Sequence, residues 1–366
     1  MNRVIGHIDL DYFYAQVEEV GDPSLGRRPV VVCVFSGRTE DSGVVSTANY
    51  RARELGVHSG MPIVQAKRKL EGKDPAIVRM DHEKYEAVSS RIMEGLEQMV
   101  DILEPTGIDE AFFDITHSTG GDYAMARKAA EALKASILES EHLTSSVGLG
   151  RSKVIAKLGS DSSKPNGLTI VPPEDTEAFL HPLQVSKLYG VGPKTSATLA
   201  EMGIAKVAEL ARAPPSELER RFGRKFGAYL LAASTGKDDD PVAGGLEPTQ
   251  FSRIVTLKRD TRDPQEVFSQ LAAGMVHVRS KLAASSKSFR TVTAIGILTD
   301  LSTKTKSRTF ETPVEDIATL REATLGLFQD LSASVGRDFR RAGVRVSGLA
   351  GFEDQRSLSE FVGKAE

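Results

Sequence analysis

Apolar and polar positions along the chain follow two periods in turn. Short apolar runs, typical of buried strands, occupy residues 3–9 and the stretch "RRPVVVCVF" (residues 27–35). Helical spacing of apolar positions follows at residues 12–20 and 83–100. Two short strands around a turn in "VDILEPTGIDEAFFDI", a helix at about 122–139 and a strand in "SSVGLG" complete the first 150 residues.

The order of these elements predicts a fold for the first part of the chain. Residues 12–78 read as an insertion, with a short helix in "STANYRARELG" and another in "PIVQAKRKL". Without the insertion, the order is β, α, β, β, α, β, which is a ferredoxin-like split βαβ unit. Its usual sheet order places the first strand antiparallel to the third. Asp9, at the end of the first strand, should therefore lie beside Asp109 and Glu110, at the start of the third.

The second half of the chain repeats this order after a helical stretch. Residues 170–235 predict short helices broken by Gly and Pro, and "GKDDDPVAGGLEPTQ" (236–250) predicts an interdomain linker. A second βαββαβ unit then follows, with a tail of about 15 residues after it. Its strands are expected at 251–259, 290–299, 305–312 and 342–349, and its helices at 264–282 and 315–332. The fold class is therefore α+β and multidomain.

Composition narrows the class of protein. A chain of 366 residues is expected to form two to four domains. It has no run of about 18 apolar residues and no signal-peptide pattern at its start, so we expect a cytoplasmic protein without membrane contact. The single cysteine, Cys33, lies in an apolar run and should be a buried thiol; one thiol excludes a disulfide framework and a multi-cysteine zinc site.

Charge is distributed unevenly. The net charge is −3, but residues 245–352 contain 16 Lys and Arg against 11 Asp and Glu, a balance of +5 that leaves −8 for the rest. A basic C-terminal unit on an acidic body suits a protein that binds phosphates with one part and a metal with another.

The acidic residues at the strand ends are the first candidate chemistry. Carboxylates on an apolar strand are costly unless they are paired or coordinate a cation, and Asp9, Asp109 and Glu110 would repel one another. Oxygen-only ligands suit Mg²⁺, and two such ions can activate an attacking oxygen and stabilise a leaving pyrophosphate. Asp11 directly precedes the helix at residue 12, and we expect it to cap that helix.

Several longer motifs carry a family resemblance. "DLDYFYAQVEEV", "VVVCVFSGRTEDSGVVSTANYRARELGV", "GIDEAFFDI", "VGLGRSKVIAKLGSDSSKPNG" and "LYGVGPKTSATLAEMGI" occur in consecutive order over nearly the whole chain. Together they resemble the Y-family, or translesion, DNA polymerases, and within them the DinB branch with its archaeal relatives. The resemblance implies a right-hand arrangement: palm at 1–11 and 79–167, fingers at 12–78, thumb at 168–235, a linker at 236–244, a little finger at 245–352 and a tail at 353–366.

The resemblance also implies site residues. The metal ligands would be Asp9, the Leu10 carbonyl, Asp109 and Glu110, holding two Mg²⁺ ions for which Mn²⁺ is expected to substitute. Tyr14 would be the steric gate whose ring excludes a ribose 2′-hydroxyl. The backbone at Tyr12 and Phe13 would donate to triphosphate oxygens. The other nucleotide-binding candidates are Thr47, Tyr50, Arg53 and Lys164, and the candidates for the roof over the templating base are Val44 and Ser46.

Other motifs predict contacts with DNA and with a partner. "LYGVGPKTSATLAEMGI" is a helix-hairpin-helix pattern, whose glycines let the backbone approach a phosphate. Alternation in "STKTKSR" sends its basic residues to one sheet face, which would suit a duplex backbone. The candidate DNA contacts are Gly190, Gly192, Lys194, Lys258, Arg259, Arg262, Lys304, Lys306 and Arg308. The tail "QRSLSEFV" resembles a sliding-clamp-binding box with Gln355, Leu358, Phe361 and Val362.

Two departures and two alternatives accompany this interpretation. Gly107 stands where relatives usually carry Ser, and Val44 makes the expected roof bulkier than alanine would. A nucleotidyl cyclase also uses a palm with paired carboxylates, but the helix-hairpin-helix and the basic last unit argue against it. A non-catalytic DNA-binding relative would lack an acidic ligand, and all three are present. The sequence therefore predicts an active, monomeric, template-directed polymerase of low fidelity, acting on primer-template DNA and deoxynucleoside triphosphates.

Overall fold

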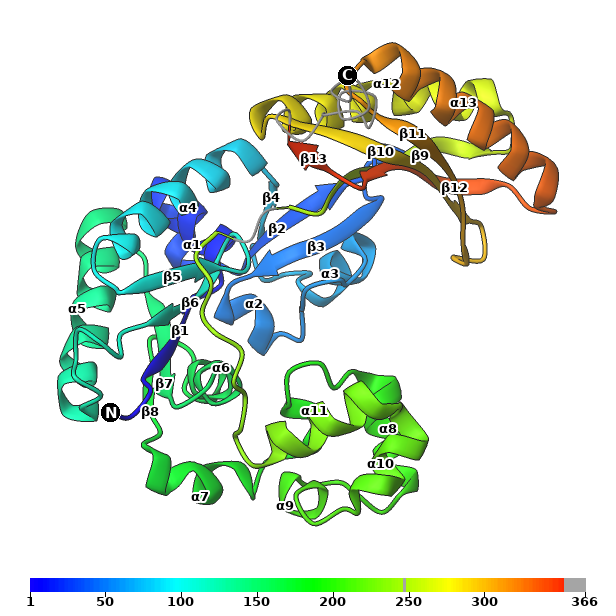
Figure 1. The fold of residues 1–366 in the computed structure, drawn as a ribbon. Helices are drawn as coiled ribbons and strands as arrows, with labels where there is room; N and C mark the ends of the chain where they lie inside the picture. The colour runs from blue at the N-terminus through cyan, green and yellow to red at the C-terminus, as the bar shows by residue number, and fades with distance from the viewer. Residues whose placement is uncertain (246–247, 352–366) are drawn as a thin grey trace, which may run out of the picture. The chain divides into compact units, whose positions relative to one another are not determined.

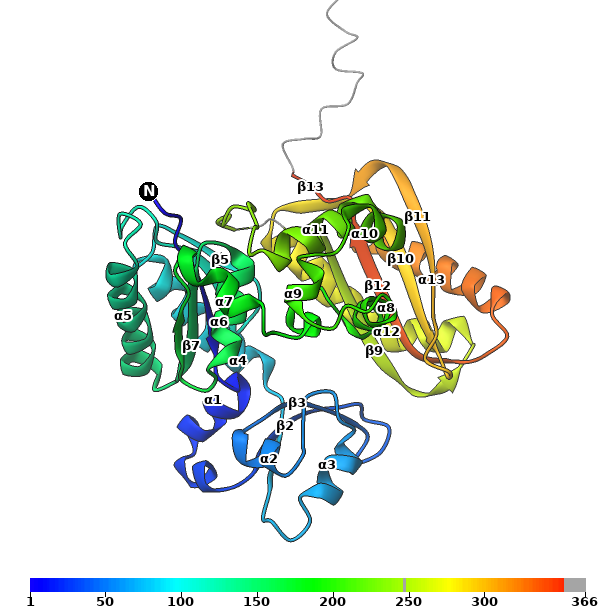
Figure 2. The same ribbon diagram turned by 90° about the horizontal axis from the view of Figure 1, so that it is seen from below.

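The computed structural model describes residues 1–245 and 248–351 (Figures 1 and 2). The chain forms two compact units: Met1–Val34 with Val44–Leu246, and Phe35–Gly43 with Glu247–Glu366. Each unit is described by itself. Among the described residues, no helix is long and apolar enough to cross a membrane.

A five-stranded sheet forms the centre of the first unit. Its strand order is β5-β6-β1-β7-β8, and β1 is antiparallel to both β6 and β7. The bounds are β1 (Ile5–Leu10), β5 (Ile102–Pro105), β6 (Glu110–Asp114), β7 (Ser145–Gly150) and β8 (Leu168–Ile170). The first four strands have the predicted order of a split βαβ unit, with β8 added at one edge.

Side chains of β1 alternate between the two faces of this sheet. Ile8 and Leu10 are buried in a core with residues from α4 (His82–Glu97) and α5 (Tyr123–Glu141). The opposite face, with His7 and Asp9, meets α6 (Lys153–Ser162), a helix that the sequence analysis did not identify. Gly148 allows this helix to lie close to β7, because a Cβ there would be 2.1 Å from the Ala156 carbonyl oxygen.

The segment between β1 and α4 carries a small three-stranded sheet of order β3-β2-β4. It contains α1 (Phe13–Gly21), η1 (Pro23–Arg27), β2 (Val30–Phe35), β3 (Gly43–Ala48), α2 (Tyr50–Glu54), α3 (Ile63–Lys69) and β4 (Ala76–Arg79). Cys33 is buried on β2, as predicted, and burial raises the pKa of its thiol to about 11. The helix predicted in "STANYRARELG" begins later than expected, so the prediction is wrong for its first residues. Its first residues extend β3, and Asn49 then caps α2 by accepting a hydrogen bond from the Ala52 amide at 3.0 Å.

Short helices follow, as expected, and pack in a hydrophobic core that also includes Val154, Ile155 and Leu158 of α6. They are η2 (Pro173–Asp175), α7 (Thr176–Leu180), η3 (Val185–Lys187), α8 (Pro193–Glu201), α9 (Val207–Leu210), α10 (Pro215–Phe222) and α11 (Arg224–Ser234). The predicted linker after them is packed against the sheet. Val242 is buried against Ile5, Phe112 and Ala156, and the Ala243 amide donates to Glu104 at 2.7 Å.

The second unit contains a fully antiparallel sheet with its own core. Its elements are β9 (Gln250–Thr261), α12 (Pro264–Ala284), β10 (Lys287–Leu298), β11 (Thr303–Val314), α13 (Ile317–Ser334), β12 (Phe339–Ser347) and β13 (Ala350–Gly351). The predicted order along the chain is confirmed. The order in space, β11-β10-β12-β9, differs from that of the first unit. The last long strand here lies between the first and second, so the two units share a chain order but not a sheet topology.

Candidate active site

Three carboxylates meet where β1 ends and β6 begins. Asp9 pairs with Glu110 in the register of the two strands. Asp109 directly precedes β6, and its carbonyl accepts a hydrogen bond from the Leu10 amide at 2.8 Å. The predicted convergence of these residues is therefore confirmed, and it follows from the antiparallel pairing of β1 with β6.

The negative charges of these carboxylates repel one another. Burial, followed by the charges of Asp9 and Glu110, raises the pKa of Asp109 to about 6. Burial also raises the pKa of Asp9, although Lys164 and Lys157 act against it. A cation placed among the three carboxylates would relieve this repulsion.

Two lysines contact the same carboxylates. The Lys157 ammonium bonds Glu110 Oε2 and lies 3.7 Å from Asp9 Oδ2. The Lys164 ammonium lies 2.6 Å from Asp9 Oδ2 and 3.0 Å from Asp161 Oδ1. Lys164 was a predicted site residue and Lys157 was not. The signal for Lys157 was the helical spacing of the apolar residues around it in "KVIAKL", which places a lysine on the sheet-facing side of a helix.

His7 is a further residue that the sequence analysis missed. It is fully buried on β1, with its Nδ1 2.8 Å from the Ser160 hydroxyl. That hydroxyl donates to the Lys157 carbonyl at 2.9 Å, so it accepts from Nδ1, and Nε2 carries no proton. Burial, then the charges of Lys157 and Lys164, holds the pKa of His7 well below its usual value. The neutral ring directs Nε2 towards Glu110 Oε2 at 3.6 Å.

The donor set suits a divalent cation in its chemistry, because it supplies carboxylate oxygens that repel one another. Its side chains are not arranged around a metal position. Within residues 1–245 and 248–351, no group of three His, Cys, Asp or Glu side chains forms a ready metal site. The oxygens of Asp9 and Glu110 are directed at lysines instead. Binding of a cation here therefore requires these side chains to rearrange.

Asp11 does not cap the helix that follows it, which corrects the prediction. The N-cap of α1 is Tyr12, without a side-chain cap. The buried Asp11 carboxylate instead accepts hydrogen bonds from the hydroxyls of Thr144 (2.8 Å) and Ser146 (2.7 Å) and from the Asn166 amide (2.8 Å). Asp11 thus ties the end of β1 to β7 and to the turn that carries Lys164.

A cavity of about 300 Å³ opens beside the carboxylates. Its lining brings together four segments that are far apart in the sequence, and every predicted metal- and nucleotide-binding residue except Glu110 takes part. The lining residues are Asp9, Leu10, Tyr12, Phe13, Tyr14, Ser46, Thr47, Tyr50, Arg53, Ser59, Asp109 and Lys164. Ser59 was not predicted. Val44 was predicted but lies outside this lining and is exposed.

The aromatic residues after β1 have distinct positions in this cavity. Phe13 is buried in the core, and its ring centroid lies 5.5 Å from that of Tyr14. The Tyr14 ring stacks on Tyr85, with centroids 4.4 Å apart. Tyr12 has a φ of 36°, in the left-handed region, and such strain is common at functional sites. Because α1 lacks a side-chain cap, the amides of its first turn can receive an anion.

The opposite wall of the cavity is formed by β3 and α2. Tyr50 and Arg53 share one face of α2, and the guanidinium lies 5.0 Å from the Tyr50 ring centroid. Arg53 Nε donates to the Ala48 carbonyl at 2.8 Å, which fixes the side chain towards β3. Thr47 and Ser46 enter the wall from β3, not from a helix.

The predicted helix-hairpin-helix is present in part. Pro193 begins α8, with Gly192 as N-cap, and Lys194 is in its first turn. Gly190 has a φ of 78°, which only glycine adopts readily. The element before the turn is the three-residue 3₁₀ helix η3, and not a full helix.

The basic residues of β11 share one face of the sheet in the second unit, as predicted, but that face carries the helices. Lys304 pairs with Gly296, and a Cβ on Gly296 would lie 3.1 Å from Leu331 of α13. Lys306 bonds Asp330 of α13 at 2.8 Å. Figure 1 shows α12 and α13 together on one side of the sheet. A duplex therefore cannot lie flat against this face.

The opposite face of that sheet carries basic residues that the sequence analysis missed. Arg345 pairs with Thr293 and Arg341 with Ile297, which alternate with the helix-facing residues of β10.

Two of the predicted DNA-contact residues near the end of β9 form ion pairs with acidic neighbours. Arg259 lies 2.7 Å from Glu266, and Arg262 lies 3.2 Å from Asp338.

The clamp-binding prediction concerns the C-terminal tail. Gln355, Leu358, Phe361 and Val362, the predicted clamp-binding residues, lie outside the described residues.

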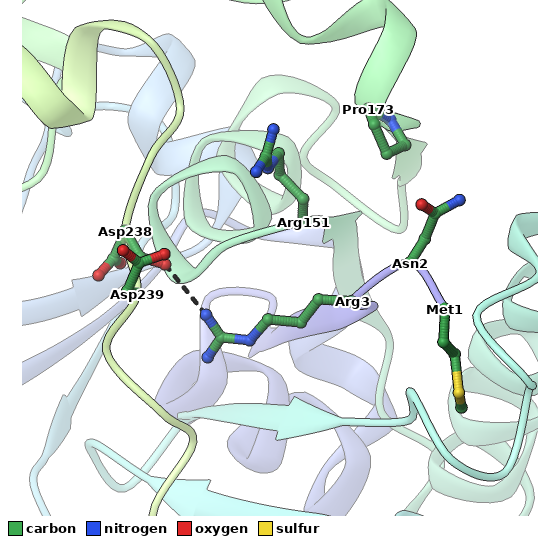
Figure 3. A pocket seen from close by; sticks show the side chains of 7 residues that line it. All are labelled: Met1, Asn2, Arg3, Arg151, Pro173, Asp238 and Asp239. Atoms are coloured by element: carbon green, nitrogen blue, oxygen red, sulfur yellow. Dashed lines mark hydrogen bonds between the residues drawn. The ribbon is translucent and has the colours of Figure 1, made fainter.

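A second cavity, of about 310 Å³, lies near the start of β1, at the end away from Asp9 (Figure 3). There Arg3 donates to the carbonyl of Asp238 at 3.0 Å and so helps to hold the packed linker. None of the predicted site residues lines this second cavity.

The sequence of this chain matches known protein families and curated relatives. Residues 8–161 match the impB/mucB/samB family, residues 248–359 its C-terminal domain, and residues 186–238 the DNA polymerase-iota thumb domain. DNA polymerase IV of Methanosarcina acetivorans is 42% identical over 99% of this chain and 100% of its own. That of Nitrosopumilus maritimus is 38% identical over 98% and 99%.

The fold of this chain is also similar to solved structures of DNA polymerases. The "Y-family DNA polymerase chimera Dbh-Dpo4(243-245)-Dbh" superposes with a TM-score of 0.90 at 34% identity, covering 95% of this chain and 99% of that one. An insertion ternary complex of Dbh DNA polymerase superposes with a TM-score of 0.70 at 34% identity, with the same coverage.

Proposed function

The chain belongs to the impB/mucB/samB family of DinB-like Y-family DNA polymerases, and from this premise we propose how its own residues carry out synthesis. It is a template-directed DNA polymerase of the translesion type. The observation that carries the proposal is the cavity beside β1. It collects the metal- and nucleotide-binding candidates, except Glu110, from four separate segments of the chain.

The carboxylates would hold two Mg²⁺ ions, for which Mn²⁺ can substitute. Asp9, Asp109, Glu110 and the Leu10 carbonyl are the ligands in this proposal. The bound ions would activate the primer 3′-hydroxyl for attack on the α-phosphate and neutralise charge on the leaving pyrophosphate. The support in the structure is the shared strand edge of Asp9 and Glu110 and the mutual repulsion that raises the pKa of Asp109 to about 6.

The cavity would position the incoming deoxynucleoside triphosphate. The amides of the first turn of α1, together with Tyr50, Arg53 and Lys164, surround the place for the phosphates. Tyr14 would exclude ribose, because its ring is backed by Tyr85 and cannot easily move away from a 2′-hydroxyl. Positioning and charge neutralisation supply most of the rate enhancement in such a site.

DNA would be bound by backbone contacts in both units. The turn at Gly190 and Gly192 offers amides and Lys194 to a phosphate. In the second unit, Arg341 and Arg345 lie on the face that α12 and α13 do not cover, which makes that face the better duplex surface. Lys258, Lys304, Lys306 and Arg308 would reach phosphates from the strand end and the edge.

Low fidelity and bypass of damaged bases belong to the same proposal. Ser46 lies in the cavity wall and would contribute a small side chain to the roof over a templating base, whereas Val44 is exposed on β3. The small Ser46 side chain would tolerate altered template bases. The protein would act as a monomer and bind a sliding clamp through its C-terminal residues.

Primer extension tests the proposal. The intact chain is assayed on a primed template with four deoxynucleotides and Mg²⁺, beside Glu110→Ala and the exposed control Glu139→Ala. We expect template-dependent extension by the intact chain and the control, none by Glu110→Ala, and equal DNA binding by all three in an anisotropy assay. Extension by Glu110→Ala at the level of the intact chain would remove the metal-site assignment.

A further inference from the structure

Two ammonium groups occupy carboxylate oxygens that a metal ion would use. Lys157 bonds Glu110 Oε2, and Lys164 bonds Asp9 Oδ2 at 2.6 Å. These lysines come from α6 and from the turn before β8, and their side chains are 17% and 26% exposed. A half-buried ammonium at such a distance interacts more strongly with a carboxylate than a solvated surface lysine does.

We propose that Lys157 is a positioning residue that competes with divalent cations for the Glu110 and Asp9 carboxylates, so that metal binds tightly only when this lysine is displaced. The inference rests on the proposed function, because it concerns the same carboxylates. Lys157 would have two effects: it would hold the carboxylates together despite their repulsion, and it would weaken metal binding by the free protein.

The surroundings of Lys157 support a displaceable contact. A pocket of about 520 Å³ that Lys157 helps to line gives its side chain room to withdraw from Glu110. Its lining includes the carboxylate of Asp240, which can receive the ammonium, whereas the Glu104 carboxylate in the same lining already accepts from Lys153 at 2.9 and 2.7 Å. His7 would stay in place when Lys157 moves, because its Nδ1 is fixed by Ser160. Glu110 could then turn towards a metal ion while remaining against a rigid neutral ring.

Lys164 would complete the sequence of events. It shares its ammonium between Asp9 and Asp161, 3.0 Å away, and it lines the nucleotide cavity. An incoming triphosphate would draw Lys164 from Asp9 and would bring its own oxygens for the metal. Metal and nucleotide binding would then reinforce each other, because the triphosphate removes Lys164 from the metal ligand Asp9, and a metal ion bound at Asp9 leaves Lys164 free to contact the triphosphate.

The test is direct measurement of Mn²⁺ binding by electron paramagnetic resonance on the free protein, without DNA or nucleotide. Lys157→Gln is compared with the intact chain and with Lys128→Gln, which removes one exposed charge from α5. We expect Lys157→Gln to bind Mn²⁺ at least fivefold more tightly, and Lys128→Gln to bind it like the intact chain. Unchanged or weaker Mn²⁺ binding by Lys157→Gln would overturn the inference.

Two further measurements keep the result clear. Circular dichroism establishes that Lys157→Gln is folded; if it is not, Lys157→Met, which keeps the length of the side chain, is used with the same criterion. Primer extension by the intact chain separates the two proposals. Extension that depends on Glu110, with unchanged Mn²⁺ affinity in the Lys157 variant, would reject only this inference. Absence of extension by the intact chain would reject the proposed function itself.

Discussion

Asp109 shows most clearly how the clustered carboxylates lower the stability of the folded protein. Its pKa is raised to about 6 by burial and by the charges of Asp9 and Glu110. The folded protein therefore holds this proton more tightly than the unfolded chain does. The stability cost is fully present above about pH 6 and disappears as the pH falls below the unfolded pKa of about 4.

Asp109→Asn should accordingly stabilise the metal-free protein at pH 8. We expect a gain of up to about 3 kcal/mol, from a shift of about two pKa units, and almost no gain at pH 4. Thermal unfolding in EDTA at both pH values measures it. Asp239→Asn, an exposed substitution in the packed linker, should show neither the gain nor its pH dependence. A variant that melts at or below the intact chain at pH 8 would contradict the assigned repulsion.

Tyr14 gives a second prediction at this scale. Tyr14→Ala should raise the relative kcat/KM for ribonucleotides over deoxynucleotides by on the order of 100-fold, because it removes the ring that a 2′-hydroxyl would meet. Single-nucleotide incorporation with matched nucleotide pairs measures the ratio. Tyr14→Phe keeps the ring stacked on Tyr85 and should leave the ratio unchanged. If both variants keep the original preference, Tyr14 is not the gate.

Residue positions could be predicted where a local pattern determined them. The carboxylates Asp9 and Glu110 were found because the end of one strand and the start of another are visible in the sequence. Asp11 was misassigned as a cap because its true contacts, Thr144, Ser146 and Asn166, are more than 130 residues away. Lys157 was missed for the same reason: its position depends on how closely α6 lies on β7.

At the scale of elements, that close packing depends on Gly148. A Cβ at this position would lie 2.1 Å from the Ala156 carbonyl oxygen and 2.3 Å from the Ser160 amide. Gly148→Ala should push α6 away from β7, cost about 1–3 kcal/mol of unfolding free energy and reduce extension, because α6 packs on the sheet face that carries Asp9. Urea unfolding and primer extension measure the two effects.

Gly95 provides the matched control. It lies in α4, and a Cβ there would meet nothing within 4 Å. Gly95→Ala should therefore be neutral or stabilise the protein by about 0.5–1 kcal/mol. Equal stability of both variants would mean that α6 can move away from β7 without cost.

The two βαββαβ units show what element order alone can predict. In the first unit, the order led to the correct sheet and therefore to the site. In the second, the same order gave a different sheet, because β12 lies between β10 and β9. The order along the chain does not determine which edge of a hairpin the last strand joins. For this reason the sequence predicted that Lys304, Lys306 and Arg308 share a face, but not that α13 lies on it.

At the scale of the whole molecule, chemistry and charge are divided between the two units. All the metal- and nucleotide-binding candidates that line the cavity belong to the first unit, whereas residues 245–352 carry the basic balance of +5. A chain ending at residue 246 should therefore keep its Mn²⁺ affinity and lose affinity for DNA. We expect at least a tenfold loss in about 0.1 M salt and a shallower dependence of log K on log salt, because fewer phosphates are neutralised.

Fluorescence anisotropy on primed DNA over a series of salt concentrations measures both quantities. Arg341→Ala with Arg345→Ala in the full chain should reproduce part of the loss, whereas Lys306→Ala should have a smaller effect, because Lys306 already bonds Asp330. If the shortened chain keeps both the affinity and the salt slope, DNA is held by the first unit alone. The turn at Gly190 and Gly192 would then be the main phosphate contact, and the basic charge of the second unit would need another explanation.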